Sequence, residues 1–189
     1  TNESPDIRVN HGIGRTFQKI RMQKYTRVID EIKMGFFRHT KNKYNFIDVI
    51  FQTSNYISEE KKIIEKTVEI MDLLNISNLA NQIAEDLPFG QQRKVSIARA
   101  LALKPELLLL DEPASGLNPN ETRELIELIY RIKKEFNLTI IVIEHDMSVI
   151  MTICHDIIAM NEGNIIGVGT PIEIQNNEKV IESYLGGVS

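Results

Sequence analysis

Two short apolar segments on either side of one amphipathic segment constrain the fold of this chain more than any other feature. Residues 107–110 are four consecutive leucines, residues 139–143 read Thr-Ile-Ile-Val-Ile, and charged residues follow both runs. Such short, unbroken runs are typical of strands that are buried on both faces of a parallel sheet. Strand, helix and strand in this spacing predict a βαβ unit with parallel strands and a right-handed crossover.

The segment between the two strands is predicted to be a helix. Asn118 and Pro119 open it, with proline at the first helical position, and Glu121 lies at the spacing of a capping box. Its inner face is formed by five apolar residues at helical spacing: Leu125, Leu128, Ile129, Ile132 and Phe136.

Two helices are expected before these strands. Residues 36–56 are predicted to be irregular, and a helix is predicted to start at Ser58, a plausible N-cap. Its expected apolar face is Ile63, Ile64, Thr67, Val68, Met71 and Leu74. A second helix is expected from about Gln91 to Leu103, where Pro105 ends it.

The C-terminal part has a different pattern. Residues 156–160 and 164–168 flank Asn161-Glu162-Gly163, which predicts a β-hairpin. Thr170-Pro171-Ile172-Glu173 is a capping box, and it predicts a terminal helix.

Length and composition fit one domain and exclude several classes of protein. The chain has 189 residues and a net charge of 22 minus 26, or −4, so no basic field indicates nucleic acid as a partner. No apolar run approaches the roughly 20 residues that a membrane span requires. The single cysteine, Cys154, excludes an internal disulfide and fits a reducing compartment.

Asp111 and Glu112 directly follow the first apolar strand, at the edge where open α/β sheets bind ligands. Neighbouring residues of an extended segment point in opposite directions, so one acid could address a metal ion and the other a water molecule. This is the arrangement that phosphoryl transfer needs. A buried strand capped by two solvated acids is the alternative, and the two residues alone do not decide between these interpretations.

Three other features carry little information singly. His145 follows the second strand, where it could sense a terminal phosphate, although a lone histidine is more often a solvated or capping residue. Gly90 lies at the start of a helix, whose free N–H groups suit a phosphate, although an ordinary capped turn explains it equally well. Gln18 by itself predicts only a surface residue.

Taken together and in order, these segments resemble the nucleotide-binding subunit of ABC transporters, from about residue 11 to residue 185. The matching positions are the signature motif at Leu87, Pro88, Phe89, Gly90 and Gln91, the Walker B acids Asp111 and Glu112, the D-loop at Ser115, Gly116, Leu117 and Asn118, the switch histidine His145, and the Q-loop glutamine Gln18. Residues 12–18, 87–93, 116–122 and 184–186 are most similar to branched-chain amino acid importer ATPases of the LivG type.

The resemblance implies an α/β fold, P-loop NTPase-like, with a mostly parallel sheet and helices on both faces. It also implies a helical signature subdomain at about residues 36–103, and a catalytic core with a C-terminal hairpin and helix at residues 104–189. Within the helical part, residues 36–86 would dock a transmembrane protein.

The resemblance also implies roles for single residues. Asp111 and Gln18 would hold Mg²⁺, Glu112 would activate the attacking water, and His145 would contact the γ-phosphate of ATP. Gln18 would also couple the site to the membrane subunit. Residues 87–91 would complete the ATP site of a second ATP-binding subunit, identical or different, in a head-to-tail dimer.

The resemblance also implies that the protein is a bacterial transport ATPase that lies on the cytoplasmic face of the cell membrane. Its partners would be transmembrane permease subunits and, indirectly, a solute-binding protein. Three alternatives stay open: the ATPase of another ABC system such as a lipid or lipopolysaccharide exporter, a non-catalytic interaction module, and a soluble ABC ATPase outside transport.

The sequence departs from the family pattern in three places. Pro88 replaces the usual serine of the signature, and Asn118 replaces the usual aspartate of the D-loop; both changes fit the LivG-type branch. No G-x-x-x-x-G-K-[ST] phosphate-binding loop occurs in the 189 residues. With no initiator Met and a polar start at residues 1–10, the expectation is an incomplete chain that lacks at least about 30 residues and is inactive alone.

Overall fold

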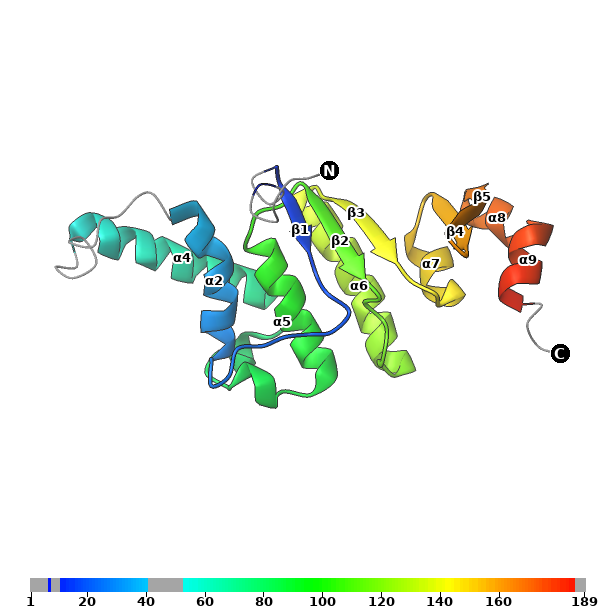
Figure 1. Ribbon diagram of the computed structural model, residues 1–189. Coiled ribbons are helices and arrows are strands. Elements are labelled where there is room, and N and C mark those ends of the chain that lie inside the picture. The colour runs from blue at the N-terminus through cyan, green and yellow to red at the C-terminus, as the bar shows by residue number, and fades with distance from the viewer. Residues whose placement is uncertain (1–6, 8–10, 41–52, 186–189) are drawn as a thin grey trace.

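The structure is a computed structural model, and it describes residue 7, residues 11–40 and residues 53–185. Its elements lie in a row, with a helical part at one end, a parallel sheet in the middle and a hairpin with short helices at the other end (Figure 1). The predicted α/β class with a parallel sheet is confirmed.

The sheet has three parallel strands in the order β1-β2-β3. They are β1 (Ile13–Arg15), β2 (Leu107–Asp111) and β3 (Thr139–Ile143). Leu107 lies opposite Ile13 on one side and opposite Thr139 on the other, and the β2–β3 ladder continues to Asp111 and Ile143. Both predicted strands and their parallel pairing are therefore confirmed.

Helix α6 (Pro119–Phe136) is the crossover between β2 and β3. The side chain of Asn118 accepts the backbone N–H groups of Asn120 and Glu121, and the Glu121 carboxylate accepts the N–H of Asn118, which completes the predicted capping box. At the other end, Asn137 adopts a left-handed conformation with φ of 50°. Leu125, Leu128, Ile129 and Ile132 are buried as predicted, whereas Phe136 is partly exposed.

Strand β3 is exposed on one face, as far as the described residues show. Leu108 and Leu110 are buried against the core that includes α5 and α6, but Ile141 and Ile143 of β3 are 50% and 60% exposed. The expectation that β3 is buried on both faces is therefore not met among the described residues. The residue types alone do not predict whether a strand face is exposed, because an apolar run has the same sequence pattern whether or not a second layer covers it.

The helical part contains α2 (Val28–Thr40), α4 (Ser54–Leu73) and α5 (Phe89–Leu101), with two 3₁₀ turns, η1 (Ser77–Leu79) and η2 (Ala84–Asp86), between the last two helices. The expected irregular segment 36–56 is wrong at both ends, because α2 reaches Thr40 and α4 begins at Ser54; residues 41–52 lie outside the described residues. The N-cap of α4 is Thr53, and Ser58 lies inside the helix with its hydroxyl bonded back to the Asn55 carbonyl.

The other helix boundaries of this part differ less from expectation. On α4, Ile63, Thr67, Met71 and the C-cap Leu74 are buried as expected, but Ile64 and Val68 are more than a third exposed. Helix α5 begins and ends two residues earlier than predicted, at Phe89 and Leu101.

The C-terminal part contains α7 (Met147–Ile153), β4 (Ile157–Asn161), β5 (Asn164–Gly169), α8 (Pro171–Gln175) and α9 (Glu178–Leu185). The predicted hairpin is confirmed: β4 and β5 pair in antiparallel fashion, and Glu162 and Gly163 both have the positive φ of a tight hairpin turn. Thr170 caps α8 as predicted. The expected single terminal helix is two helices, because Asn177 starts α9 by accepting the N–H groups of Lys179 and Val180.

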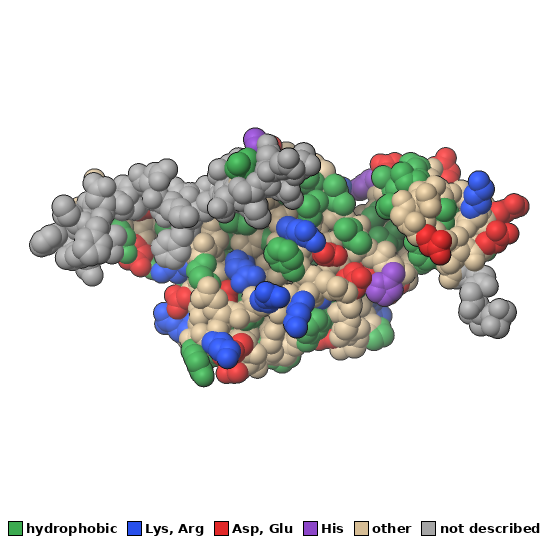
Figure 2. Space-filling view, in the orientation of Figure 1, with side chains coloured by type: hydrophobic (Ala, Val, Ile, Leu, Met, Phe, Trp, Pro, Cys, Tyr) green, Lys and Arg blue, Asp and Glu red, His purple; other side chains and the backbone are tan. Residues whose placement is uncertain are grey.

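Two apolar cores hold these parts together. The larger one joins α2, α4, α5, α6 and the sheet, and the smaller one, which includes Ile157, Ile174 and Val180, joins the hairpin to α7, α8 and α9. The outer face of the hairpin remains apolar and exposed, with Ile158, Ile165 and Val168 more than 60% accessible (Figure 2). Among the helices that the structure describes, none is long and apolar enough to span a membrane.

We predict that Ile132→Ala destabilises the protein by about 2–5 kcal/mol, because it leaves a cavity beneath the sheet where Ile132 is fully buried. Urea unfolding followed by circular dichroism measures the change. The matched control is Ile172→Ala, at a position that is 73% exposed, which should stay within about 0.5 kcal/mol. Equal losses for the two variants would show that α6 does not pack as described.

Candidate functional site

Two acids lie at the carboxyl edge of the sheet, each held by a different partner. Arg15, the last residue of β1, forms an ion pair with Asp111 at 2.9 Å between Nη2 and Oδ2. Gln18 donates its side-chain amide to Glu112, at 2.6 Å between Nε2 and Oε2. The parallel pairing of β1 with β2 brings residues that are more than 90 positions apart in the chain into contact, and it joins the predicted site residues Gln18, Asp111 and Glu112.

The backbone separates the two acids. Asp111 is the last residue of β2, but Glu112 adopts a left-handed conformation with φ of 42°, which is uncommon for a residue with a side chain. The Glu112 N–H still donates to the Ile143 carbonyl at 2.8 Å. We expected strand alternation to point the two side chains in opposite directions. This expectation is wrong, because a turn at Glu112 breaks the extended backbone. Strained backbone of this kind persists where the surrounding structure fixes it, often at functional sites.

Glu144 is a buried carboxylate between two loops of the predicted site. Its side chain is 1% exposed, its Oε1 accepts the Ala114 N–H at 2.7 Å, and its Oε2 accepts the His145 N–H at 3.2 Å. It therefore fastens the end of β3 to the loop that follows Glu112. Its one signal in the sequence is that it is an acid directly after an apolar strand.

Arg93 is the buried cation of this region. It is 1% exposed, its Nη1 donates to the Phe17 carbonyl at 3.4 Å, and its Nε and Nη2 have no hydrogen-bond partner among the described residues. Burial lowers the pKa of its guanidinium, while the charges of Glu144, Glu112 and Asp111 act to raise it. Arg93 thus connects α5 with Phe17, the residue before Gln18.

His145 also lies at the carboxyl edge of the sheet, but its side chain is mostly exposed to solvent. Its side chain is 72% exposed, and its Nδ1 lies 3.9 Å from Oε2 of Glu144. The next residue, Asp146, caps α7 through the N–H and hydroxyl of Ser148, and the hydroxyl bond is the main cause that lowers the pKa of this carboxyl. The structure leaves the histidine ring accessible from solvent.

The signature residues and the D-loop residues pack against each other in the same chain. Gly116 has φ of 78°, and a Cβ there would lie 3.2 Å from the ring of Phe89. Phe89 in turn lies beneath the Arg93 guanidinium, 5.2 Å from ring centre to Cζ. A side chain at Gly90 would meet the Glu121 carboxylate at 2.7 Å. Leu87 is buried, while Pro88 and Phe89 are exposed.

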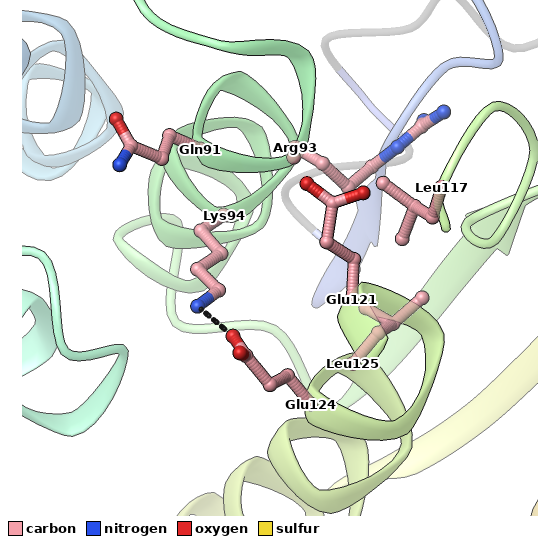
Figure 3. A pocket seen from close by; sticks show the side chains of 8 residues that line it. Gln91, Arg93, Lys94, Leu117, Glu121, Glu124 and Leu125 are labelled. Carbon is pink, nitrogen blue, oxygen red and sulfur yellow. Dashed lines mark hydrogen bonds and ion pairs between the residues drawn. The ribbon is translucent and has the colours of Figure 1, made fainter. Parts of the chain in front are cut away.

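A pocket of about 230 Å³ opens between α5 and α6, beside these residues. Figure 3 shows Lys94 of α5 paired across it with Glu124 of α6, at 2.9 Å, and the hydrogen bond from Lys94 is the main cause that lowers the pKa of Glu124. Arg93 points away from this ion pair, toward the side where Leu117 lies. Acidic and basic side chains both line the pocket, together with Gly90 and Gln91 of the signature segment and Leu117 of the D-loop.

A partly buried ion pair connects the segment after Gln18 to the helical part. Glu31 of α2 is fully buried, and its Oε2 accepts from Nη1 of Arg99 of α5 at 2.9 Å. The same arginine atom donates to the Arg21 carbonyl at 3.2 Å, and Glu31 also accepts the N–H of Gln23. Neither charge was identified from the sequence, where both lie on ordinary helical faces.

The acids at the sheet edge fit Mg²⁺ bound with a nucleotide, but not a metal site made by protein alone. Among the described residues, no group of three or more His, Cys, Asp or Glu side chains could hold a metal ion. Asp111 and Gln18 supply oxygen ligands, and Mg²⁺ in phosphoryl-transfer sites typically takes one or two such ligands together with substrate phosphates and water. The donor set is therefore compatible with Mg²⁺ carried by ATP.

A parallel sheet with paired acids at its carboxyl edge, a glutamine on one of them and a signature helix beside them define the class of nucleotide-hydrolysing α/β proteins. Comparison with known proteins places the chain more closely. The family model described as ABC transporter matches residues 4–115, and the chain belongs to this family of ATP-binding, ATP-hydrolysing transporter domains. A second family model, described as branched-chain amino acid ATP-binding cassette transporter, matches residues 164–188.

Curated relatives point to the same branch. The chain is 38% identical over 175 residues to the high-affinity branched-chain amino acid transport ATP-binding protein BraF of Pseudomonas aeruginosa, and 37% identical to LivG of Escherichia coli K12. In both cases the match covers 93% of this chain and 68% of the relative. The resemblance predicted from the motifs is therefore confirmed.

Solved structures agree on the fold. The ADP conformation of an ATP-binding cassette of an ABC transporter superimposes with a TM-score of 0.78 at 28% identity, over 98% of this chain and 73% of that chain. A putative metal-chelate type ABC transporter in an inward-facing conformation superimposes with a TM-score of 0.76 at 23% identity, over 92% of this chain and 64% of that chain, and it supports the fold alone.

We predict that Glu31→Gln destabilises the protein by about 1–3 kcal/mol, because the change weakens the charge-assisted hydrogen bond between the buried Glu31 carboxylate and Arg99. Urea unfolding measures the loss. The matched control is Asp30→Asn on the same helix, which breaks an exposed ion pair with Arg27 and should cost less than about 1 kcal/mol. If both variants lost less than about 1 kcal/mol, the Glu31–Arg99 pair would not hold the Gln18 segment to α2 and α5.

Proposed function

We propose that this chain is the ATP-hydrolysing subunit of an importer that energises uptake of branched-chain amino acids across the cell membrane. The observation that carries the proposal is the contact between Gln18 and Glu112 at the end of β2, beside Asp111. The names of the relatives BraF and LivG support the cargo.

In this proposal, Glu112 is the general base that takes a proton from the water attacking the γ-phosphate. A positioned base of this kind contributes roughly 10²–10⁴ in rate. Gln18 donates its amide to the Glu112 carboxylate, which fixes the direction in which the free lone pairs of Glu112 point. His145 contacts the γ-phosphate, and the exposure of its ring leaves it free to do so.

Asp111 and Gln18 are the residues of this chain that would hold Mg²⁺. The ion neutralises charge on the phosphate oxygens when it is bound with ATP. Arg15 pairs with Asp111 at 2.9 Å and keeps this carboxylate at the sheet edge. Because the Arg15 side chain is 52% exposed and that of Asp111 is 24% exposed, a ligand can compete for the carboxylate at modest cost.

The signature residues 87–91 act on the ATP of a second ATP-binding subunit. The D-loop, Ser115, Gly116, Leu117 and Asn118, lies against the same helix and forms the other part of this surface. Packing of Phe89 on Gly116 keeps the two segments together, so they move toward the partner as one unit. The functional assembly is therefore a dimer, of identical or different subunits.

The remaining assignments concern the partners. Residues 36–103 form the helical subdomain, of which residues 36–86 dock the transmembrane permease, and residues 104–189 form the catalytic core and C-terminal part. The protein is peripheral, on the cytoplasmic face of the membrane, and a solute-binding protein delivers the cargo to the permease. The Glu31–Arg99 pair supports a mechanical link from this subdomain to the Gln18 segment.

The test is ATP turnover by the full-length protein assembled with its permease partners. Glu112→Gln should lower turnover at least 100-fold, because the amide cannot accept the proton, while ATP affinity stays within about threefold. Glu127→Gln, an exposed position on α6, is the matched control and should keep wild-type turnover. Undiminished turnover in the Glu112→Gln assembly would overturn the role of Glu112.

The cargo is tested separately in vesicles that contain the same assembly and its solute-binding protein. We expect ATP, supplied on the side of the membrane where the subunit lies, to drive accumulation of leucine, isoleucine or valine on that same side. Lysine and glutamate should not accumulate. Accumulation of charged amino acids, or turnover that no branched-chain amino acid stimulates, would contradict the assigned cargo.

A further inference from the structure

We propose that Arg15 is a specificity-determining residue of the Mg²⁺ site, which makes Asp111 available to metal bound with nucleotide and not to the free divalent ion. Nη2 of Arg15 lies 2.9 Å from Oδ2 of Asp111, so the guanidinium and a metal ion compete for the same carboxylate. This role rests on the proposed function, in which Asp111 is a ligand of Mg²⁺. It extends that function by stating which form of the metal can reach the carboxylate.

Asp111 differs from the other two acids of this edge in the kind of group that holds it. Glu112 accepts from the neutral amide of Gln18, and Glu144 accepts from two backbone N–H groups. Of these three carboxylates, Asp111 is the one in ion-pair contact with an arginine or lysine, among the residues that the structure describes. A metal ion at either oxygen of Asp111 therefore meets a positive charge that the protein itself supplies.

The surroundings of Arg15 allow it to leave Asp111 without losing every contact. Its side chain is 52% exposed, and its Cζ lies 5.0 Å from the ring centre of Phe17, which is itself 57% exposed. The N–H of Thr16 still donates to the Leu109 carbonyl at 2.9 Å, which extends the pairing of β1 with β2 by one residue. A cation over an exposed aromatic ring is favourable, so the guanidinium retains a partner when the carboxylate is taken.

The charge of the incoming group decides whether Arg15 opposes its binding. A free divalent cation and a guanidinium repel each other, most strongly at the short distances that a shared carboxylate imposes. Mg²⁺ bound to ATP or ADP has a net negative charge, because the phosphates carry more charge than the ion neutralises. For that complex a displaced guanidinium is a nearby counter-charge. Arg15 therefore lowers the affinity of Asp111 for the free ion without lowering its affinity for the metal–nucleotide complex.

The consequence is that metal and nucleotide bind together. A group of carboxylates such as Asp111, Glu112 and Glu144 attracts divalent ions by its summed charge. Arg15 offsets part of this charge at the one acid of the three that is proposed to ligate the metal. The amide of Gln18 cannot do the same for Glu112, because it is neutral.

The test is Mn²⁺ binding at this edge of the full-length protein, measured without nucleotide. Mn²⁺ substitutes for Mg²⁺ and broadens the NMR signals of nearby amides, so the amides of Leu110 and Glu112, on either side of Asp111, report occupancy there. We expect Arg15→Met to bind Mn²⁺ about tenfold more tightly than the wild type, the order that removal of one unit charge at ion-pair distance gives for a divalent ion near water. Adding Asp111→Asn to this variant should abolish the gain.

The same titration with Mn²⁺ and ADP separates selectivity from a general change of the site. Arg15→Met should not bind the Mn²⁺–ADP complex more tightly than the wild type by more than about threefold, the range of an exposed ion pair. The matched control is Arg27→Met at the start of α2, because Arg27 is also 52% exposed and pairs with Asp30 at 2.8 Å. It should leave both affinities unchanged, whereas a purely structural role of Arg15 would change neither affinity relative to the other.

Equal Mn²⁺ affinities of the wild type and Arg15→Met would overturn the proposal, as would a gain that persists when Asp111→Asn is added. A gain of the same size for Mn²⁺ and for Mn²⁺ with ADP would also overturn it, because Arg15 would then not distinguish the two. The proposed function fails separately, if Asp111→Asn alone binds Mn²⁺ with ADP as tightly as the wild type.

A measurement on the wild-type protein decides if Arg15→Met does not fold. The side-chain Nε–H signal of Arg15 should shift when Mg²⁺ and ADP are added together and stay in place with the same concentration of Mg²⁺ alone, while that of Arg27 stays in place in both cases. An Arg15 signal that responds equally to the two additions, or to neither, would overturn the proposal.

Discussion

The structure depends on the parallel ladder that places β2 between β1 and β3. Each strand supplies its neighbours with backbone hydrogen bonds over three to five residues, and all three strands end at the same edge. Because the ladder aligns Arg15 with Leu109 and Asp111 with Ile143, the residues that follow each strand meet in space although they are far apart in sequence. The predicted ABC-type site is a direct result of this register.

The second constraint on the structure is electrostatic, because several carboxylates lie close together at the carboxyl edge of the sheet. Asp111, Glu112 and Glu144 lie there together, and each is engaged by an identified partner: Arg15, the Gln18 amide, and the N–H groups of Ala114 and His145. Arg93 adds one buried positive charge behind them. The loops at this edge are therefore fixed by electrostatics and hydrogen bonds, whereas the helices behind the sheet are fixed by apolar burial.

Much of the fold could be predicted from the sequence wherever a local signal determines structure. The capping boxes at Asn118 and Thr170 fix where two helices begin, and the Glu162-Gly163 turn fixes the hairpin. The predicted start of α4 is wrong because Ser58 and the two glutamates that follow it have the sequence pattern of a helix N-terminus. The signal was ambiguous, since a serine inside a helix can bond back to its own backbone.

The site could be predicted as a set of residues but not as a geometry. Gln18, Asp111, Glu112 and His145 follow from motif order, and the first three are indeed brought together. Arg93 and Glu144 matter through contacts 76 and 30 positions away in the chain, which no local pattern reveals. The left-handed turn at Glu112 is also hidden, because nothing about a glutamate in sequence predicts positive φ.

The central claim is that Gln18 and Glu112 form one hydrogen-bonded unit at the end of β2. The most direct test is NMR of the Gln18 side-chain amide in the isotope-labelled protein. We predict amide proton signals displaced from those of a free glutamine, which return to the free position in Glu112→Ala and stay displaced in Asp111→Ala. Signals at the free position in the wild-type protein, or signals that do not respond to Glu112→Ala, would contradict this account.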